Sequence, residues 1–157
     1  MNKPILLIED DPQESSGMKT AIERHFTGFE VQIVETEHEF RQTLAGLGED
    51  CPWSLVISEA MITWAFADPD QPEPPPEVKL GTFKQGGTRC WSEFRRKFPR
   101  GDIPWVYFTV LNKEHFNFPE FSGKRTFYMN KSLSWRQIQR TIEAIQRLLA
   151  QEALTKK

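Results

Sequence analysis

Ser54-Leu55-Val56-Ile57-Ser58 is a short apolar segment, and the residue that follows it directly is Glu59. Four further segments of this kind, rich in β-branched or aromatic residues, lie at 5–8, 31–34, 103–108 and 126–129. None of them alternates cleanly between apolar and polar residues, which is typical of strands buried on both faces of a parallel sheet. The sequence therefore predicts five parallel strands, with Glu59 at the end of the third.

Amphipathic stretches separate these segments, with apolar residues three or four positions apart. The sets are Met18, Ile22 and Phe26; Phe40, Leu44 and Leu47; Trp91, Phe94 and Phe98; and Trp135, Ile138, Ile142, Ile145 and Leu149. This spacing predicts helices with one buried face, and Ser134 with Gln137 predicts a capped start for the last of them. Strands that alternate with helices favour a doubly wound α/β fold with right-handed crossovers.

Two stretches interrupt this alternation. Residues 64–87 contain Pro69, Pro72, Pro74, Pro75, Pro76, Gly81, Gly86 and Gly87. We therefore predict a long, partly polyproline surface loop there, with neither helix nor central strand. Residues 112–124 hold Phe116, Phe118 and Phe121 among turn-forming residues, which predicts a short or irregular helix. These phenylalanines are either an exposed interaction patch or, in the interpretation we favour, an inward-packed replacement for a full helix.

Size and composition limit the class of protein. A chain of 157 residues, 38% hydrophobic and 27% charged, is typical of one globular domain, which we place at 1–150 with a tail at 151–157. A net charge of −2 gives no basic excess for nucleic acid. No apolar run reaches the ~18 residues that span a bilayer. Cys51 and Cys90 lack metal-type spacing and are expected to be reduced thiols in a cytoplasmic protein.

Five polar residues fall at or just beyond the ends of predicted strands: Glu9, Asp10, Glu59, Thr109 and Lys131. Doubly wound sheets gather ligands at the carboxyl ends of their strands, at the topological switch point. We therefore expect these side chains to meet in one pocket.

These residues and their order resemble the receiver domains of response regulators in two-component signalling. Ile5-Leu6-Leu7-Ile8-Glu9-Asp10-Asp11 is similar to that family's first strand and acidic pair, Val106-Tyr107-Phe108-Thr109 to its hydroxyl-bearing fourth strand, and Tyr128-Met129-Asn130-Lys131 to its lysine-bearing fifth. The resemblance covers about residues 1–63 and 86–150. It implies a flavodoxin-like receiver fold with a five-stranded parallel sheet in the order 2-1-3-4-5, a long insert after strand 3 and an irregular fourth-helix region.

The resemblance also implies roles for residues. In such a domain an acidic pair and a reactive aspartate hold Mg²⁺, and a hydroxyl and a lysine contact the phosphoryl group received from a histidine kinase. By position, the metal ligands are Glu9, Asp10, Glu59 and the backbone carbonyl of Met61; the phosphoacceptor position is Glu59; the switch residues are Thr109 and Tyr128; and the lysine is Lys131. The chain departs from the family's pattern at Thr63, Val110 and Ser132, and most of all at Glu59.

Glutamate keeps the charge of aspartate, but its carboxylate lies one methylene further out, about 1.5 Å of extra bond length. A misplacement of ~1 Å can cost about a hundredfold in rate, so Glu59 is expected to impair phosphate acceptance more than metal binding. We predict that Glu59 imitates phosphorylation by pairing with Lys131 and attracting the Thr109 hydroxyl. The alternatives are an acid left over in a decayed site and a site that still switches, through metal occupancy or a different modification. Glu9, Asp10 and Glu59 would also repel one another, which predicts at least one raised pKa and weak Mg²⁺ binding.

The function expected from these features is that of an atypical, stand-alone receiver-like domain that signals by protein–protein interaction and is not an enzyme. Its expected partner is a histidine kinase or a downstream effector, and a homodimer stays open. One alternative is a Mg²⁺-dependent receiver that still accepts phosphate at Glu59, Asp11 or Ser58. Another is a structural adaptor that binds partners through the proline-rich loop or the phenylalanine cluster.

Overall fold

A computed structural model describes residues 3–100, 102–115, 125–131 and 135–155. Its five strands are β1 (Ile5–Ile8), β2 (Val31–Val34), β3 (Leu55–Ser58), β4 (Trp105–Thr109) and β5 (Thr126–Asn130). They pair in parallel in the order β2-β1-β3-β4-β5, as the resemblance implied. In this topology the connection from β2 passes over β1 to β3, so the order reverses between β1 and β3, where a doubly wound sheet binds its ligands.

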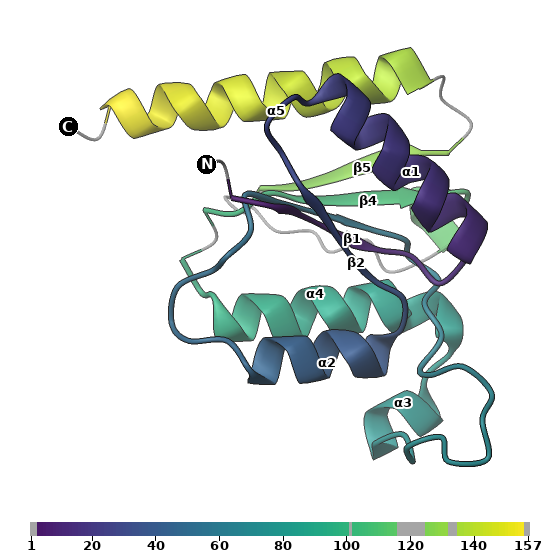
Figure 1. Cartoon of the computed structure of the whole chain (residues 1–157). Coiled ribbons are helices and arrows are strands. Elements are labelled where there is room, and N and C mark those ends of the chain that lie inside the picture. Colours follow the sequence, from purple (N-terminus) through teal and green to yellow (C-terminus); the bar gives the residue numbers. More distant parts are fainter. Residues whose placement is uncertain (1–2, 101, 116–124, 132–134, 156–157) are drawn as a thin grey trace.

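Helices cover both faces of the sheet (Figure 1). One face carries α1 (Pro12–His25) and α5 (Trp135–Thr155), and the other carries α2 (Glu37–Ala45) and α4 (Gly86–Lys97). Alternate strand residues face opposite sides: Leu6 and Ile8 pack in the core under α2 and α4, whereas Ile5 and Leu7 pack in the core under α1 and α5. Burial on both faces explains why the strands lack polar alternation.

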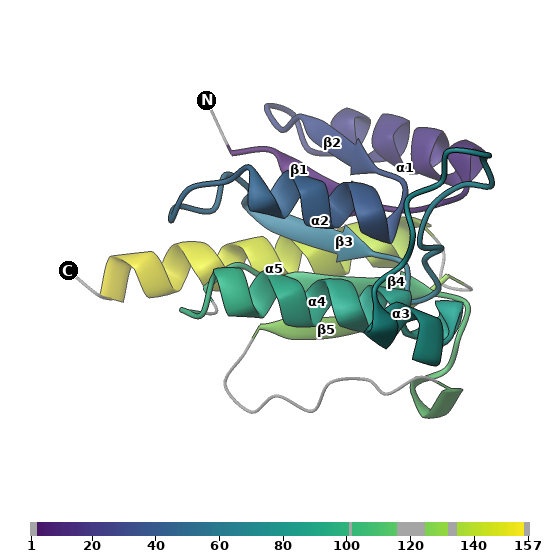
Figure 2. The same cartoon turned by 90° about the horizontal axis from the view of Figure 1, so that it is seen from below.

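The prediction that residues 64–87 contain no helix is wrong. The segment includes a short helix, α3 (Pro76–Leu80), and a 3-10 turn at Phe83–Gln85, and α4 already begins at Gly86. Pro76 explains the error, because a proline at the first helical position lacks only an N–H that would be unpaired there and already has a helical φ. In Figures 1 and 2, α3 stands beside α4 near the end of the sheet where the strands finish.

Two other regions are the C-terminal tail and residues 112–124. The helix α5 continues to Thr155, so the tail predicted at 151–157 is helical over most of its length, in keeping with its run of good helix formers. In 112–124, the structure shows a 3-10 turn at Lys113–His115. Phe116, Phe118, Phe121 and the predicted cap Ser134 lie outside the described residues. In the described part of the chain, no helix has the length and apolar content needed to cross a membrane.

The start of α4 is pressed against the loop that follows β3. The amide of Gly87 donates to the carbonyl of Ala60 at 2.9 Å. A Cβ atom added at Gly87 would lie 2.3 Å from the backbone oxygen of Glu59 and 2.9 Å from Cα of Ala60. Only glycine lets the start of α4 approach the backbone of Glu59 and Ala60 this closely. The helix therefore supports the loop that carries Glu59.

This contact predicts opposite results for two Gly→Ala substitutions in helices. Gly87→Ala should lower the free energy of unfolding by roughly 1–3 kcal/mol, because backbone atoms must move to admit the methyl group. Gly17→Ala, in α1, meets no heavy atom within 4 Å and should raise the free energy of unfolding by about 0.5–1 kcal/mol. Urea denaturation of the two variants measures both changes, and equal effects at the two sites would contradict the close approach at Gly87.

Candidate functional site

The strand ends bring Glu9, Glu59 and Lys131 into direct contact. Ile8 pairs with Ser58, and the amide of Glu59 donates to the carbonyl of Ile8 at 2.9 Å, so the two glutamates emerge side by side. Lys131, just past β5, places Nζ 2.8 Å from Oε2 of Glu9 and 2.7 Å from Oε2 of Glu59. Glu9 and Glu59 are 2% and 5% exposed, and the Lys131 side chain is 12% exposed. The lysine therefore bridges two buried carboxylates.

A third carboxylate reaches the same ammonium. Glu14, in the first turn of α1, also forms an ion pair with Nζ of Lys131. In a capping box, a glutamate at this position would bond back to the amide of the capping residue. Here that amide, on Asp11, donates instead to Oε1 of Glu9 at 3.1 Å. Sequence analysis missed Glu14; its only signal was its place in the first turn after the acidic pair.

The other oxygen of Glu59 turns back onto its own loop. Oε1 accepts the amide N–H groups of Ala60 at 2.7 Å and of Met61 at 3.1 Å. Both carboxylate oxygens of Glu59 are thus engaged, one by backbone amides and one by Lys131. The structure places Met61 beside Glu59 as an amide donor, while its proposed role as a carbonyl ligand stays a prediction.

The remaining acidic residues of the first loop have separate tasks. Oδ2 of Asp10 accepts the amide of Thr63 at 2.9 Å, which ties the first loop to the start of the insert. Asp11 caps α1 by accepting the amides of Gln13 and Glu14.

Ser58, at the end of β3, was the other residue considered as a phosphate acceptor. It is fully buried and donates its hydroxyl to the backbone oxygen of Glu59 at 2.8 Å.

Thr109 and Tyr128 meet at the turn after β4 rather than at the carboxylates. Oγ1 of the buried Thr109 accepts the amide of Leu111 at 3.2 Å, and the hydroxyl of Tyr128 donates to the carbonyl of Leu111 at 2.6 Å. The amide of Lys131 donates to the carbonyl of Thr109 at 2.9 Å. The two predicted switch residues therefore share one turn, and this turn is joined by backbone to the bridging lysine.

Burial sets the protonation preferences of the cluster. It raises the pKa of Glu9 above its ordinary value, and the bond to Lys131 offsets only part of this effect. Burial likewise raises the pKa of Asp10, so the raised pKa predicted from the sequence occurs in two residues. For Lys131, burial alone would lower the pKa, but hydrogen bonds to Glu14, Glu59 and Glu9 outweigh it and raise the pKa.

These residues do not fit a magnesium site in this arrangement. Mg²⁺ requires near-octahedral oxygen ligands, whereas Lys131 already binds one oxygen each of Glu9 and Glu59, and backbone amides bind the others. Within the described residues, no group of three or more His, Cys, Asp or Glu side chains is placed to hold a metal ion. A metal ion would have to displace the lysine from Glu9 and Glu59, so we derive no chemical step through it.

Comparison by sequence finds no relatives, because no protein-family model and no curated protein matches the chain. Comparison by structure finds solved structures with the same fold. A response regulator receiver domain protein from Methanospirillum hungatei JF-1 is 19% identical with a TM-score of 0.65, and the match covers 97% of this chain and 99% of that one.

Two other solved structures agree with this match. A signal receiver domain of a two-component histidine kinase from Clostridium thermocellum is 14% identical with a TM-score of 0.66, covering 92% of this chain and 98% of that one. A two-component response regulator from Clostridium difficile is 17% identical with a TM-score of 0.61, covering 93% of this chain and 97% of that one. At such identities the likeness establishes the fold, and the chemistry has to be argued from the residues.

Proposed function

We propose that this chain, whose fold is that of response-regulator receiver domains, is a receiver-like signalling domain held in one state by Glu59 and Lys131. It acts by protein–protein contact and not as an enzyme. The observation that supports the proposal is the bridge from Nζ of Lys131 to Glu9 and Glu59, at 2.8 and 2.7 Å. The proposed partner is a signalling protein, either a histidine kinase or a downstream effector.

The engagement of Glu59 argues against phosphate acceptance. Phosphoryl transfer to a carboxylate depends on a positioned nucleophilic oxygen and on neutralised charge. Here Oε1 of Glu59 accepts two amides and Oε2 is paired with Lys131, so neither oxygen is free to attack. The same contacts supply a fixed, charge-neutralised carboxylate where a receiver would carry a removable group.

The state that we propose differs in one respect from the imitation of phosphorylation predicted from the sequence. The Thr109 hydroxyl was expected to turn toward Glu59, but it accepts the amide of Leu111. We therefore assign the fixed state to the bridge alone, which reaches the turn after β4 through the backbone bond from Lys131 to Thr109. The adaptor alternative is supported by the folded insert, whose contacts are described below.

Phosphate labelling tests this proposal. Incubation of the wild-type chain with acetyl phosphate and Mg²⁺ should give no acyl phosphate, whereas Glu59→Asp should be labelled at least about a hundredfold faster, because the shorter side chain restores the acceptor position. Mass spectrometry of the intact chain measures the product, and Glu59→Gln serves as the control without a nucleophile. Rapid, stoichiometric labelling of the wild type would refute the proposal.

A further inference from the structure

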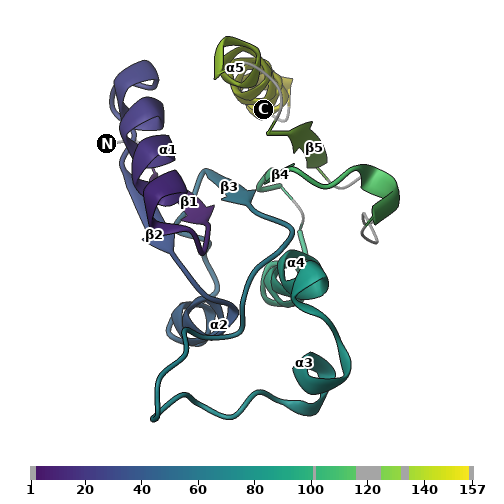
Figure 3. The ribbon, with the colours of Figure 1, turned by 90° about the vertical axis from the view of Figure 1, so that its right-hand side faces the viewer.

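The insert after β3 is a folded arm with defined anchors. Its first anchor is Trp64, whose indole N–H donates to the carbonyl of Pro72 at 2.8 Å. The guanidinium of Arg41, on α2, lies 5.7 Å from the centre of the Trp64 ring and also pairs with Glu77, on α3, at 2.9 Å. The arm emerges where the strands end, and α3 stands away from the sheet (Figure 3).

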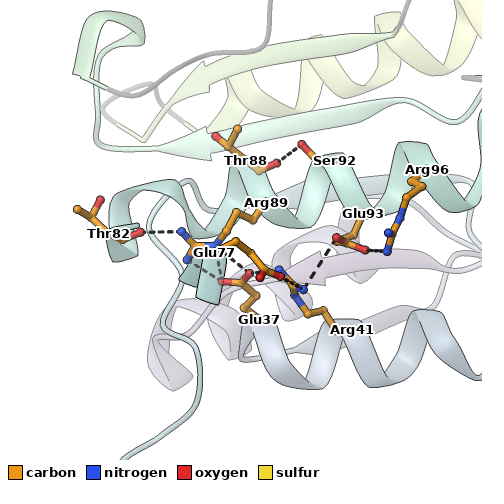
Figure 4. A network of polar contacts seen from close by, with 9 residues as sticks. All are labelled: Glu37, Arg41, Glu77, Thr82, Thr88, Arg89, Ser92, Glu93 and Arg96. Carbon is orange, nitrogen blue, oxygen red and sulfur yellow. Dashed lines mark hydrogen bonds and ion pairs between the residues drawn. The ribbon is translucent and has the colours of Figure 1, made fainter. Parts of the chain in front are cut away.

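A second set of contacts fixes the end of the arm, as the close view in Figure 4 shows. Arg89, on α4, binds the buried carboxylate of Glu37 through Nε and Nη2 and donates from Nη1 to the carbonyl of Thr82 at 3.1 Å. A Cβ atom at Gly81 would lie 2.6 Å from Nη1 of Arg89, so a larger residue at position 81 would make the end of the Arg89 side chain shift. The contacts of Arg89 with Thr82 and of Arg41 with Glu77 therefore hold the segment around Gly81 in place.

This braced segment presents apolar side chains to solvent. Leu80 is 90% exposed and Phe83 is 59% exposed. We call residues 78–84 the insert ridge. The ridge contains Lys79 and Lys84 and no acidic residue. Single exposed apolar residues are common in folded proteins, but large apolar side chains that are exposed as a group mark interaction surfaces.

We propose that the insert ridge is a docking surface for an acidic, amphipathic segment of a partner protein. Leu80 and Phe83 supply apolar anchors, and Lys79 and Lys84 favour carboxylates next to them. Lys79 is paired with Glu73, but both side chains are at least half exposed, and such a surface pair exchanges readily with a partner's carboxylate.

A second copy of this chain is a poorer occupant. In a symmetric pair of copies the two ridges would face each other, so Lys79 and Lys84 would meet the same lysines of the second copy. A partner that brings acidic and apolar residues on one face suits the ridge better.

The ridge is also joined to the loop that carries Glu59. The amide of Ile62 donates to the carbonyl of Phe83 at 3.1 Å, and two amides of that same loop bind Glu59. Docking could thus be sensed at the carboxylate cluster. The docking surface itself does not depend on the state proposed for Glu59, because Leu80 and Phe83 are exposed and the ion pair of Lys79 is with Glu73.

Peptide display tests the ridge. A random peptide library is selected on the full wild-type chain, and the enriched sequences are synthesised and titrated against the wild type and the double variant Leu80→Ser/Phe83→Ser. We expect acidic residues interleaved with apolar ones three or four positions apart. The double variant should weaken binding at least about tenfold, and Lys84→Glu should weaken it while Val110→Ser, an exposed apolar control away from the ridge, should not.

The outcomes are distinct. Enriched peptides that are basic or uncharged, binding that the double variant leaves unchanged, or no enrichment at all would each overturn the proposal. Self-association of the wild type that the double variant abolishes, measured by sedimentation, would replace the partner by a second copy. Since Leu80 and Phe83 are exposed, the double variant should keep the thermal midpoint of the wild type, and this is checked first. Glu59→Gln should still bind the peptides, so failure of the ridge is distinguishable from failure of the proposed state.

Discussion

Lys131→Met is expected to lower the free energy of unfolding by about 3 kcal/mol at neutral pH. The substitution keeps most of the length of the side chain but leaves Glu9 and Glu59, both almost fully buried, without their shared cation. Removing one partner of a buried ion pair is costly because the other charge stays buried and uncompensated. We expect the lower end of the usual range, since backbone amides still bind one oxygen of each glutamate.

The pH dependence of stability should change with this substitution. In the wild type, the raised pKa of Lys131 contributes stability that is complete below the ordinary pKa of lysine and is lost as the pH rises through the raised value. In Lys131→Met this alkaline loss should disappear. The raised pKa of Glu9 already makes the folded state take up the Glu9 proton before the unfolded state does, so stability rises on acidification. This rise should be larger in the variant, because Lys131 no longer offsets the effect of burial on Glu9.

Urea denaturation from mildly acidic to strongly alkaline pH measures both effects. Lys79→Met is the matched control, because Lys79 belongs to a half-exposed pair with Glu73, and its unfolding midpoint should stay near that of the wild type at every pH. A wild-type-like midpoint for Lys131→Met would mean that the bridge does not stabilise the fold, and the proposed fixed state would lose its physical basis.

The meeting of Glu9, Glu59 and Lys131 was predictable from sequence because it follows from backbone position alone. Each residue comes directly after a buried strand, and neighbouring parallel strands end at the same edge. The Thr109 hydroxyl was also expected at this edge, but its rotamer depends on the turn at Leu111, whose amide it accepts. Periodicity and spacing carry no information about such a local choice.

The contacts that sequence analysis missed come from helix starts and from the insert. Glu14 reaches Lys131 only because Glu9 takes the amide of Asp11. The bond from Thr63 to Asp10 depends on the path of a loop of irregular structure. In the insert, the prolines were taken as helix breakers, although Pro76 begins α3. The first two features rest on particular tertiary contacts, which override local propensity, whereas the start of α3 follows from proline's preference for the first helical position.

Glu37→Gln is expected to lower the free energy of unfolding by at least about 3 kcal/mol. Glu37, at the start of α2, is completely buried and accepts three hydrogen bonds from Nε and Nη2 of Arg89 and a fourth from Arg41, all between 2.8 and 3.1 Å. Glutamine removes the charge and turns an N–H₂ group toward one arginine. The guanidinium groups of Arg41 and Arg89 then lack their common anion. Their positive charges stay partly buried and uncompensated, which strongly destabilises the folded state.

Because Arg41 and Arg89 also hold Glu77 and Thr82, this loss should spread to the insert before it reaches the core. Hydrogen exchange in Glu37→Gln should therefore rise at residues 76–85 under conditions in which β1 and β3 remain protected. Glu77→Gln is the matched control: it removes an exposed carboxylate from the same Arg41 and leaves Glu37 in place, so it should loosen α3 with little effect on the unfolding midpoint. If both variants unfolded at the same urea concentration as the wild type, Glu37 would not be the centre of this network, and the insert ridge would need another brace.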